Sequence, residues 1–157
     1  MSIKILVLKL IFIALQLKFS TQNEQKYKVV CYFTNWAVQR PGLGSMIPEH
    51  IDPCLCTHII YAFSEMDDNK LTPMEKYDHV DGEKSGFFER INRLKHLNPK
   101  LKTLLAVGGW EMGMGDFTNM VKDDKNIAKF VKTTIEYLRK WDFDGLDLVR
   151  RNNEGLF

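Results

Sequence analysis

The strongest constraint on the fold is the recurrence of short, nearly continuous apolar segments. Such segments, rich in β-branched and aromatic residues, lie at 27–33, 57–63, 101–107 and 143–148. Strands with so few polar residues are typical of parallel sheets, in which both faces are buried. The polar run "SEMDDNK" at 64–70 is expected to end the second strand. Four such strands fit either an open sheet or half of an eight-stranded barrel, and periodicity alone does not distinguish the two.

Two segments between these strands have the apolar spacing of amphipathic helices, so the pattern predicts an α/β fold. Residues 85–97 form the first, with Ser85 as a candidate N-cap. In residues 127–141, apolar side chains recur every three or four positions behind Asp123 and Asp124. These two carboxylates suit the positive end of a helix. With 45% hydrophobic and 27% charged residues, the chain is expected to fold as a globular protein.

The first 20 residues differ from the rest. Lys4 precedes the apolar run "ILVLKLIFIAL", and polar residues follow it. A basic start followed by a short apolar stretch is typical of a secretory signal peptide. The run is shorter than the roughly 20 residues that span a bilayer, and Lys9 interrupts it. We therefore predict a signal peptide over residues 1–20 and a secreted protein with no membrane association once the signal is removed.

The charge of the remaining chain argues against a nucleic-acid partner. Loss of residues 1–20 removes Lys4, Lys9 and Lys18, which lowers the formal net charge from +2 to −1. Affinity for nucleic acid depends mainly on clustered lysine and arginine side chains. No nucleic-acid binding is expected of a nearly neutral chain without a basic face.

The three cysteines are candidates for a disulfide bond, because secreted proteins meet an oxidising environment. Cys54 and Cys56 lie two positions apart, so in an extended segment their side chains point the same way and either could pair with Cys31. A zinc site would need a fourth ligand at suitable spacing, and the four histidines are scattered. Neither a metal nor a cofactor is expected.

The candidate site lies where the strands end, because ligands bind at the carboxyl ends of strands in parallel α/β folds. The residues expected there are Asn35, Trp36, Tyr61, Phe63, Gly108, Gly109, Trp110 and Glu111, with Asp144 and Asp147 on the last strand. Aromatic side chains gathered at strand ends suit the apolar face of a sugar ring. Any one of the aromatic residues could instead pack the core.

The last predicted strand carries acidic residues in its first part, but valine and arginine follow where further acids would continue the pattern. If the strand continues, Asp147, Val149 and Arg151 project to the same face. A row of carboxylates on one strand raises the pKa values of its members, which keeps the final acid protonated near neutral pH. Only the first members of such a row are present here. Asp144 and Asp147 could equally serve as structural residues at a turn and a strand.

Three stretches together resemble animal chitinases and chitinase-like lectins of glycoside hydrolase family 18. They are "VVCYFTNWAVQRPGLGSMIPEHIDPCLCTHIIYAFSEM", "LKTLLAVGGWEMG" and "WDFDGLDL", and the resemblance covers residues 27–148. It implies a secreted (β/α)8 TIM barrel that binds chitin or chito-oligosaccharides, with a disulfide between Cys31 and Cys56 and a free Cys54. The positions that match the sugar cleft are Tyr32, Trp36, Phe63, Gly108, Gly109 and Trp110. Many members have a Glu-Trp pair in the loop after the second strand, where this chain has Glu75 and Lys76.

The resemblance also implies where catalysis would take place. The family signature on the fourth strand is Asp-x-x-Asp-x-Asp-x-Glu, in which the last Glu donates the proton and the third Asp orients the acetamido group of the substrate. Asp144 and Asp147 match the first two acids, but the third acid falls on Val149 and the Glu on Arg151. A guanidinium stays charged near neutral pH and cannot release a proton. We therefore expect the chain to be catalytically inactive, with Asp144 and Asp147 as remnants of the catalytic motif.

The length points to an incomplete barrel. A (β/α)8 barrel has eight strands and about 250 residues, whereas the chain without its signal has about 137. We interpret residues 27–148 as the N-terminal half of a TIM barrel and residues 149–157 as a divergent tail. Unpaired strand edges are expected to cause aggregation or self-association. The alternatives are a chitin-binding lectin and an unstable readthrough or splice product without function.

Overall fold

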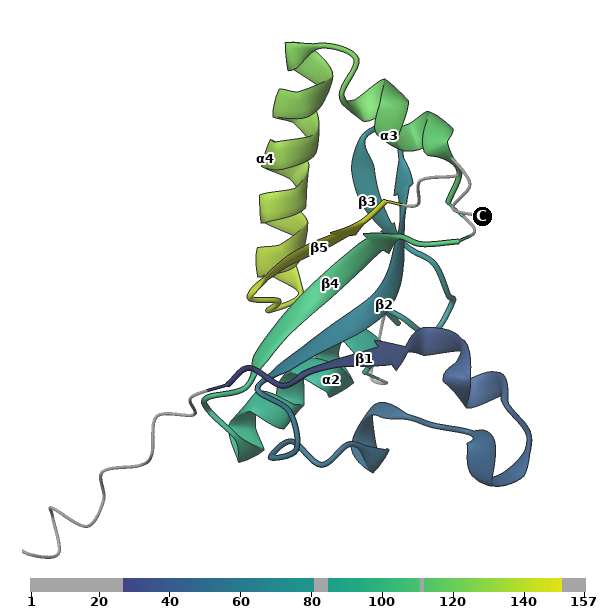
Figure 1. Cartoon of the computed structure of the whole chain (residues 1–157), viewed down its shortest axis with the longest axis vertical. Coiled ribbons are helices and arrows are strands. Elements are labelled where there is room, and N and C mark those ends of the chain that lie inside the picture. Colours follow the sequence, from purple (N-terminus) through teal and green to yellow (C-terminus); the bar gives the residue numbers. More distant parts are fainter. Residues whose placement is uncertain (1–26, 81–84, 111, 151–157) are drawn as a thin grey trace, which may run out of the picture.

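The computed structural model describes residues 27–80, 85–110 and 112–150, and the predicted signal peptide lies outside them. A parallel sheet forms its centre, with the strand order β1-β2-β4-β5 (Figure 1). The parallel strands are β1 (Val30–Thr34), β2 (His58–Asp67), β4 (Lys102–Gly108) and β5 (Gly145–Val149). The four predicted strands and their parallel pairing are therefore confirmed.

The expected end of the second strand is wrong. Strand β2 continues through the polar run to Asp67 and turns back into an antiparallel strand, β3 (Lys70–Pro73). Asp68 and Asn69 form the turn with positive φ angles of 47° and 59°, a conformation that Asp and Asn tolerate better than most residues. In this hairpin Met66 and Leu71 are buried opposite each other. The strand was missed because its alternation of polar and apolar residues lacks the continuous apolar character of the others.

Within the described residues, three α-helices and three short 3₁₀ helices connect the strands. The 3₁₀ helices η1 (Asn35–Gln39), η2 (Gly42–Gly44) and η3 (Pro48–His50) follow β1, and the α-helices are α2 (Phe87–Leu97), α3 (Met114–Met120) and α4 (Asp124–Lys140). The Asp123 side chain caps α4, accepting a hydrogen bond of 2.8 Å from the Asn126 amide. Gly86, not Ser85, occupies the N-cap position of α2, and it has no side chain with which to cap the helix. Helix α3 was not predicted from the sequence.

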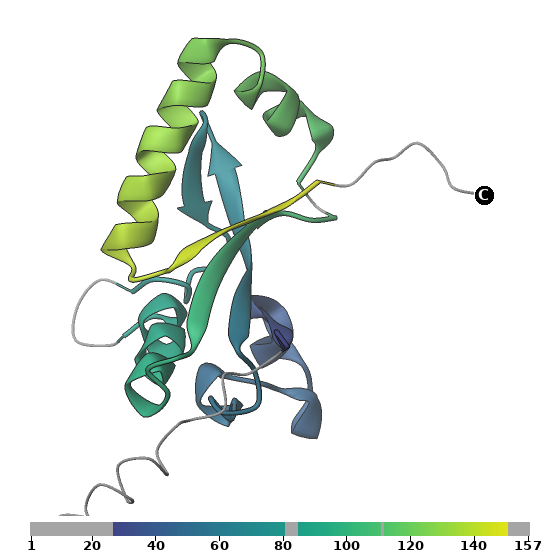
Figure 2. The same ribbon diagram turned by 60° about the vertical axis from the view of Figure 1, so that its left-hand side comes forward.

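Helices α2 and α4 lie on one face of the sheet (Figure 2). The main hydrophobic core packs between them and the sheet. Alternate strand residues such as Tyr61 and Leu105 pack there against Phe88 of α2 and Phe130 of α4. On the opposite face, here called the inner face, a smaller cluster consists of Ile60, Ala62 and Ala106, with Phe63, Leu104 and Val149 against it. Helices on one face and a separate apolar cluster on the other form part of the α/β-barrel arrangement.

One apolar stripe of α4 is more exposed than its spacing predicted. Phe130 is buried, but Ile127, Val131 and Ile135, four residues apart, remain exposed. Leu148, on the neighbouring strand β5, is also exposed. Among the described strands, β1 pairs only with β2, and β5 only with β4. The sheet therefore has an unpaired edge at each side within the described part of the chain.

Within the ranges that the structure describes, none of the helices combines the length and apolarity required to cross a bilayer.

Candidate functional site

A cavity of about 480 Å³ lies where the predicted site residues converge. Its lining consists of Trp36, Gln39, Phe63, Met74, Glu75, Gly108 and Trp110. Four of these residues were predicted from their positions after the strands. The structure thus brings the aromatic residues that follow β1, β2 and β4 to one place.

Aromatic rings form the floor of the cavity. Trp36 lies on Phe63 with ring centroids 6.1 Å apart and an angle of 11° between the ring planes. Trp36 is 37% exposed and Trp110 is 77% exposed, so both present ring surface to solvent. Phe63 follows a cis peptide bond at Ala62, where the pairing of β2 with β4 shifts register.

The two glycines after β4 allow this close approach. Gly108 and Gly109 have φ angles of 108° and 88°, which residues with a Cβ atom rarely adopt. A Cβ atom at Gly109 would lie 3.1 Å from the Phe63 ring, and one at Gly108 would lie 2.2 Å from the Val149 carbonyl oxygen. The Gly109 amide donates a hydrogen bond of 2.9 Å to the same oxygen. The absence of a side chain at Gly109 therefore leaves room for the Phe63 ring, although Gly109 does not itself line the cavity.

The polar wall of the cavity was not predicted in full. Helix η1 has about three residues per turn, which places Trp36 and Gln39 on the same side. The Gln39 side-chain amide donates to Glu75 Oε1 at 3.2 Å and to the Tyr77 hydroxyl at 2.9 Å. Glu75, which the resemblance had placed in the loop after the second strand, follows β3, but the hairpin that positions it was not predicted from the sequence. Met74 was missed for the same reason.

A buried carboxylate holds the two loops that carry this wall. Asp78 is fully buried, and its carboxylate accepts hydrogen bonds from the Asn35 side chain at 3.1 Å and 3.2 Å and from the Tyr61 hydroxyl. It also accepts from the backbone amides of Met74 at 2.9 Å and Glu75 at 2.8 Å. Burial raises the pKa of Asp78, while these hydrogen bonds act in the opposite direction. Asp78 thus links the residue before Trp36 to the loop of Glu75.

Tyr61, proposed above as a possible site residue, belongs to the core. Its ring is completely buried against Phe88, with centroids 5.0 Å apart, and its hydroxyl is bound to Asp78. Asn35 is likewise buried, and its side chain also donates to the Phe63 carbonyl oxygen at 3.1 Å. Both residues are buried and position the residues of the site through their contacts with Asp78 and Phe63.

Tyr32 and Asp147 meet on the inner face of the sheet, outside the lining of the cavity. The Tyr32 hydroxyl donates a hydrogen bond of 2.6 Å to Asp147 Oδ2, although β1 and β5 are not neighbours in the sheet. This hydrogen bond raises the pKa of Tyr32 to about 12, so its hydroxyl keeps its proton at neutral pH. The Asp147 carboxylate is therefore engaged with a phenol.

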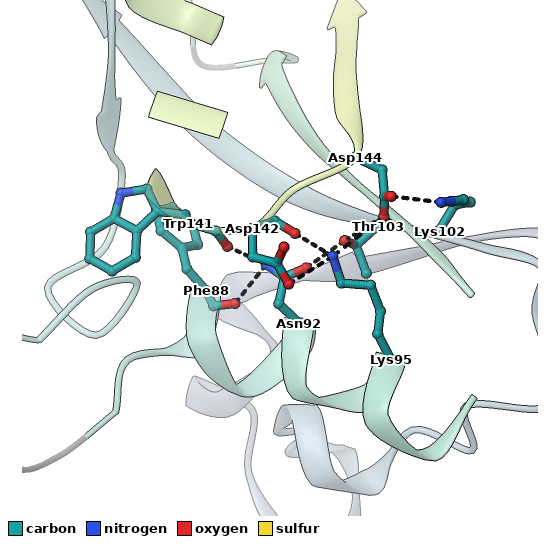
Figure 3. Close-up of polar contacts among 8 residues, drawn as sticks. All are labelled: Phe88, Asn92, Lys95, Lys102, Thr103, Trp141, Asp142 and Asp144. Atoms are coloured by element: carbon teal, nitrogen blue, oxygen red, sulfur yellow. Dashed lines mark hydrogen bonds and ion pairs between the residues drawn. The ribbon is translucent and has the colours of Figure 1, made fainter. Parts of the chain in front are cut away.

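Asp144 lies at the other end of the strand (Figure 3). It precedes β5 and contacts the beginning of β4, where its Oδ1 is 2.9 Å from Lys102 Nζ and its Oδ2 accepts a hydrogen bond of 2.9 Å from the Thr103 amide. Partial burial alone would raise its pKa, but Lys102, the Thr103 amide and Lys95 together lower it. The structure therefore places Asp144 before the first residue of β5, whereas Asp147 lies in the middle of that strand, and Asp144 does not line the cavity.

The surroundings of Asp144 form a polar junction between α2, β4 and the end of α4 (Figure 3). Lys95 Nζ lies 3.0 Å from Asp142 Oδ2 and 3.5 Å from Asp144 Oδ2. Asn92 donates to the Trp141 carbonyl oxygen at 2.8 Å and accepts from the Thr103 hydroxyl. Contacts of this kind at the amino ends of barrel strands serve stability, since ligands bind at the opposite ends.

The family resemblance assigns the third acid and the Glu of the catalytic signature to positions 149 and 151, and β5 ends at Val149. Val149 packs against the small apolar cluster of the inner face and pairs with Gly108. Arg151 and Glu111 lie outside the described residues. The Val149 side chain therefore lies among apolar residues of the inner face.

The disulfide implied by the resemblance is confirmed. Cys31 and Cys56 are bonded, with Cα atoms 6.1 Å apart, and Cys54 is a free, exposed cysteine. Across residues 27–80, 85–110 and 112–150, no three His, Cys, Asp or Glu side chains are grouped so that they could hold a metal ion.

These features define an α/β-barrel protein with an aromatic cavity at the carboxyl ends of its strands. The glycosyl hydrolases family 18 profile matches residues 28–152, and the chain belongs to this family. It is 42% identical to the oviduct-specific glycoprotein of Sus scrofa over 88% of its own length, and 46% identical to chitotriosidase-1 of Mus musculus over 77%. In each case it spans 25% of the relative.

Solved structures of the family have the same fold. Human YKL-39, described as a pseudo-chitinase with retained chitooligosaccharide binding properties, superposes with a TM-score of 0.70 at 42% identity. The match covers 78% of this chain and 32% of YKL-39. An immunomodulatory active chitinase from Trichuris suis superposes with a TM-score of 0.71 at 36% identity, over 78% of this chain and 32% of that one. The chain thus corresponds to about a third of these structures.

Proposed function

We propose that this chain is a secreted family 18 protein that binds oligomers of N-acetylglucosamine at the cavity without hydrolysing them. The observation that carries the binding proposal is the convergence of Trp36, Phe63 and Trp110 around one cavity. The proposed absence of hydrolysis rests on the family resemblance, which sets Val149 against an acid of the catalytic signature.

Binding is supported by the shape and chemistry of the cavity. Ring faces of Trp36 and Trp110 remain accessible, and a pyranose ring can lie flat on such a surface. A volume of about 480 Å³ is within the range of small-molecule sites. YKL-39, with a similar fold, retains chitooligosaccharide binding although it is a pseudo-chitinase.

The absence of hydrolysis is supported by the residues at 149 and 151. Valine cannot orient an acetamido group through a carboxylate, and arginine cannot donate a proton near neutral pH. Loss of a positioned general acid alone costs a factor of about 10² to 10⁴ in rate. Of the remaining acids, Asp147 is hydrogen-bonded to Tyr32 and Asp144 lies at the far end of the strand.

The binding proposal predicts that Trp110→Ala weakens retention on chitin. Trp110 is largely exposed, so its removal should leave the core intact. Loss of one stacking contact should weaken the affinity for an N-acetylglucosamine tetramer by about threefold to tenfold, measured by tryptophan fluorescence titration. Leu43→Ala, at an exposed position of η2 outside the cavity, is the control and should bind like the unaltered chain. Equal affinities of the Trp110→Ala variant and the unaltered chain would argue against the cavity as the binding site.

The same purified chain tests the absence of turnover. Incubation with chitin tetramers, followed by mass spectrometry of the products, should show no cleavage above the buffer control. The Val149→Asp/Arg151→Glu double variant should also be inactive, since the chain spans only a quarter of its relatives. Product release by the unaltered chain would contradict the proposal.

Secretion follows from the predicted signal peptide and fits the disulfide between Cys31 and Cys56. Expression in a eukaryotic host tests it. Recovery from the medium with an N-terminus near residue 21 is expected, and retention of Met1 on the secreted protein would contradict cleavage.

We further propose that two copies associate through the open edges of the sheet. The edge strand β1 exposes Val30 and Tyr32, while Leu148 and the α4 stripe lie exposed beside β5. Unpaired strand edges flanked by apolar side chains tend to pair with another chain. The second copy suits these edges because β5 of one copy can continue the sheet at β1 of the other.

Sedimentation velocity at increasing concentration should therefore show a dimer at the expense of the monomer. Val30→Lys places a charge on the edge strand and should shift the equilibrium toward monomer. Leu43→Lys adds the same charge at an exposed position of η2 and should leave the dimer unchanged. A monomer at every concentration would argue against this association.

A further inference from the structure

The described lining of the cavity carries a negatively charged side chain and no positively charged one. Among the described residues of its lining, Glu75 is the only one with an ionisable side chain. A glutamate carboxylate is negatively charged near neutral pH and acts only as a hydrogen-bond acceptor. Lys76 and Arg40 lie next to Glu75 and Gln39 in the sequence, but both are exposed and neither lines the cavity.

The second polar side chain of the lining also offers an acceptor. The Gln39 amide nitrogen donates to Glu75 and to Tyr77, which occupies its donor group. Its carbonyl oxygen is then the group with which Gln39 can meet a ligand. Together, the two polar side chains of the lining suit a ligand that is rich in donors.

The position of the carboxylate is fixed before a ligand arrives. The Glu75 amide is hydrogen-bonded to buried Asp78 at 2.8 Å, and Gln39 contacts Glu75 Oε1 at 3.2 Å. Asp78 also binds Asn35, the neighbour of Trp36, so the carboxylate and the indole ring are held relative to each other. Groups held in this way lose little conformational entropy on binding.

The Glu75 carboxylate and the Gln39 carbonyl oxygen would interact differently with the acetylated and the deacetylated form of the sugar unit. An acetamido group is neutral and brings a carbonyl oxygen that needs a donor, whereas a free amino group is protonated and brings three donors and a positive charge. The carboxylate attracts that charge, and so do the faces of neighbouring tryptophan rings. The lining therefore favours the free amine.

We propose that the cavity preferentially takes glucosamine units, so that partly or fully deacetylated chitin is the preferred ligand of this chain. The inference rests on the proposed carbohydrate-binding function and names the class of oligomer that the site selects. Glu75 is the residue that determines this preference.

The test compares tetramers of glucosamine and of N-acetylglucosamine by tryptophan fluorescence titration of the mature chain at about pH 6, where the amine is protonated and glutamate is ionised. The glucosamine tetramer should bind about threefold to tenfold more tightly, from one partly exposed ion pair and cation–π contact. Glu75→Gln should abolish the difference between the two tetramers, because it removes the negative charge that favours the protonated amine. Raising the salt concentration should weaken only the glucosamine tetramer.

Glu136→Gln, on the exposed side of α4, makes the same change in charge away from the cavity and should preserve the preference. Equal binding of both tetramers by the unaltered chain, or an equal loss for both in Glu75→Gln, would overturn the inference while leaving the proposed binding function in place. Failure of both tetramers to bind would refute the binding function together with the inference.

Discussion

Replacing Asp78 with alanine is expected to lower the free energy of unfolding by about 3–5 kcal/mol. The carboxylate accepts hydrogen bonds from Asn35, Tyr61 and two backbone amides, all in a buried place. Alanine would leave these donors without an acceptor and would release the loop of Glu75 from η1. Urea denaturation followed by circular dichroism measures the loss.

Two further variants test whether the loss of stability comes from the hydrogen bonds of Asp78. Asp68→Ala removes an exposed carboxylate that pairs with Lys129, and it should have little effect on stability because solvent screens an exposed ion pair. Asp78→Asn keeps the size of the side chain and one acceptor oxygen, so its loss should fall between the other two. If Asp78→Ala unfolds at the same urea concentration as Asp68→Ala, Asp78 does not hold the two loops together.

The second large effect is expected at Gly108. Gly108→Ala would place a Cβ atom 2.2 Å from the Val149 carbonyl oxygen in a residue with a φ angle of 108°. Strain and overpacking each cost about 1–3 kcal/mol, so the variant should lose about 3 kcal/mol or more. The oxygen belongs to the backbone and cannot rotate away as a side chain could. The thermal midpoint should drop, and the fluorescence of Trp110 should change as the cavity loosens.

Gly115→Ala is the matched control for this substitution. A Cβ atom at Gly115 would meet nothing within 4 Å, and the residue lies in α3, where alanine is favoured by about 1 kcal/mol. Its stability should be unchanged or slightly higher. If Gly108→Ala is as stable as Gly115→Ala, then β4 and β5 are not as close as the structure shows.

The sequence predicted the parallel sheet and the convergence of its strand ends, because both follow from local pattern and a general rule. Trp36, Phe63, Gly108 and Trp110 met at one cavity for this reason. Glu75 and Gln39 depend on the hairpin of β2 and β3 and on the buried Asp78, which are tertiary contacts without a local pattern.

Two other differences have equally specific causes. Asp144 was grouped with Asp147 because the last strand was expected to begin at Phe143, whereas β5 begins after Asp144 and leaves its carboxylate at the amino end. The spacing in α4 predicted an apolar face but not how much of it is covered, and Ile127, Val131 and Ile135 remain exposed among the described residues. The partner of Cys31 was open from spacing alone and came from the family resemblance.

The pairing of the strands also bears on how the chain folds. Val30 pairs with His58, His58 with Lys102, and Leu104 with Gly145, so each parallel pair joins residues distant in the sequence. Closing such loops costs entropy before any pair is formed, which makes folding slow compared with helical proteins of similar size. The β2–β3 hairpin and α4 need only local contacts and are the elements that can form first. During synthesis, β1 must therefore wait for later strands before its apolar side chains are covered.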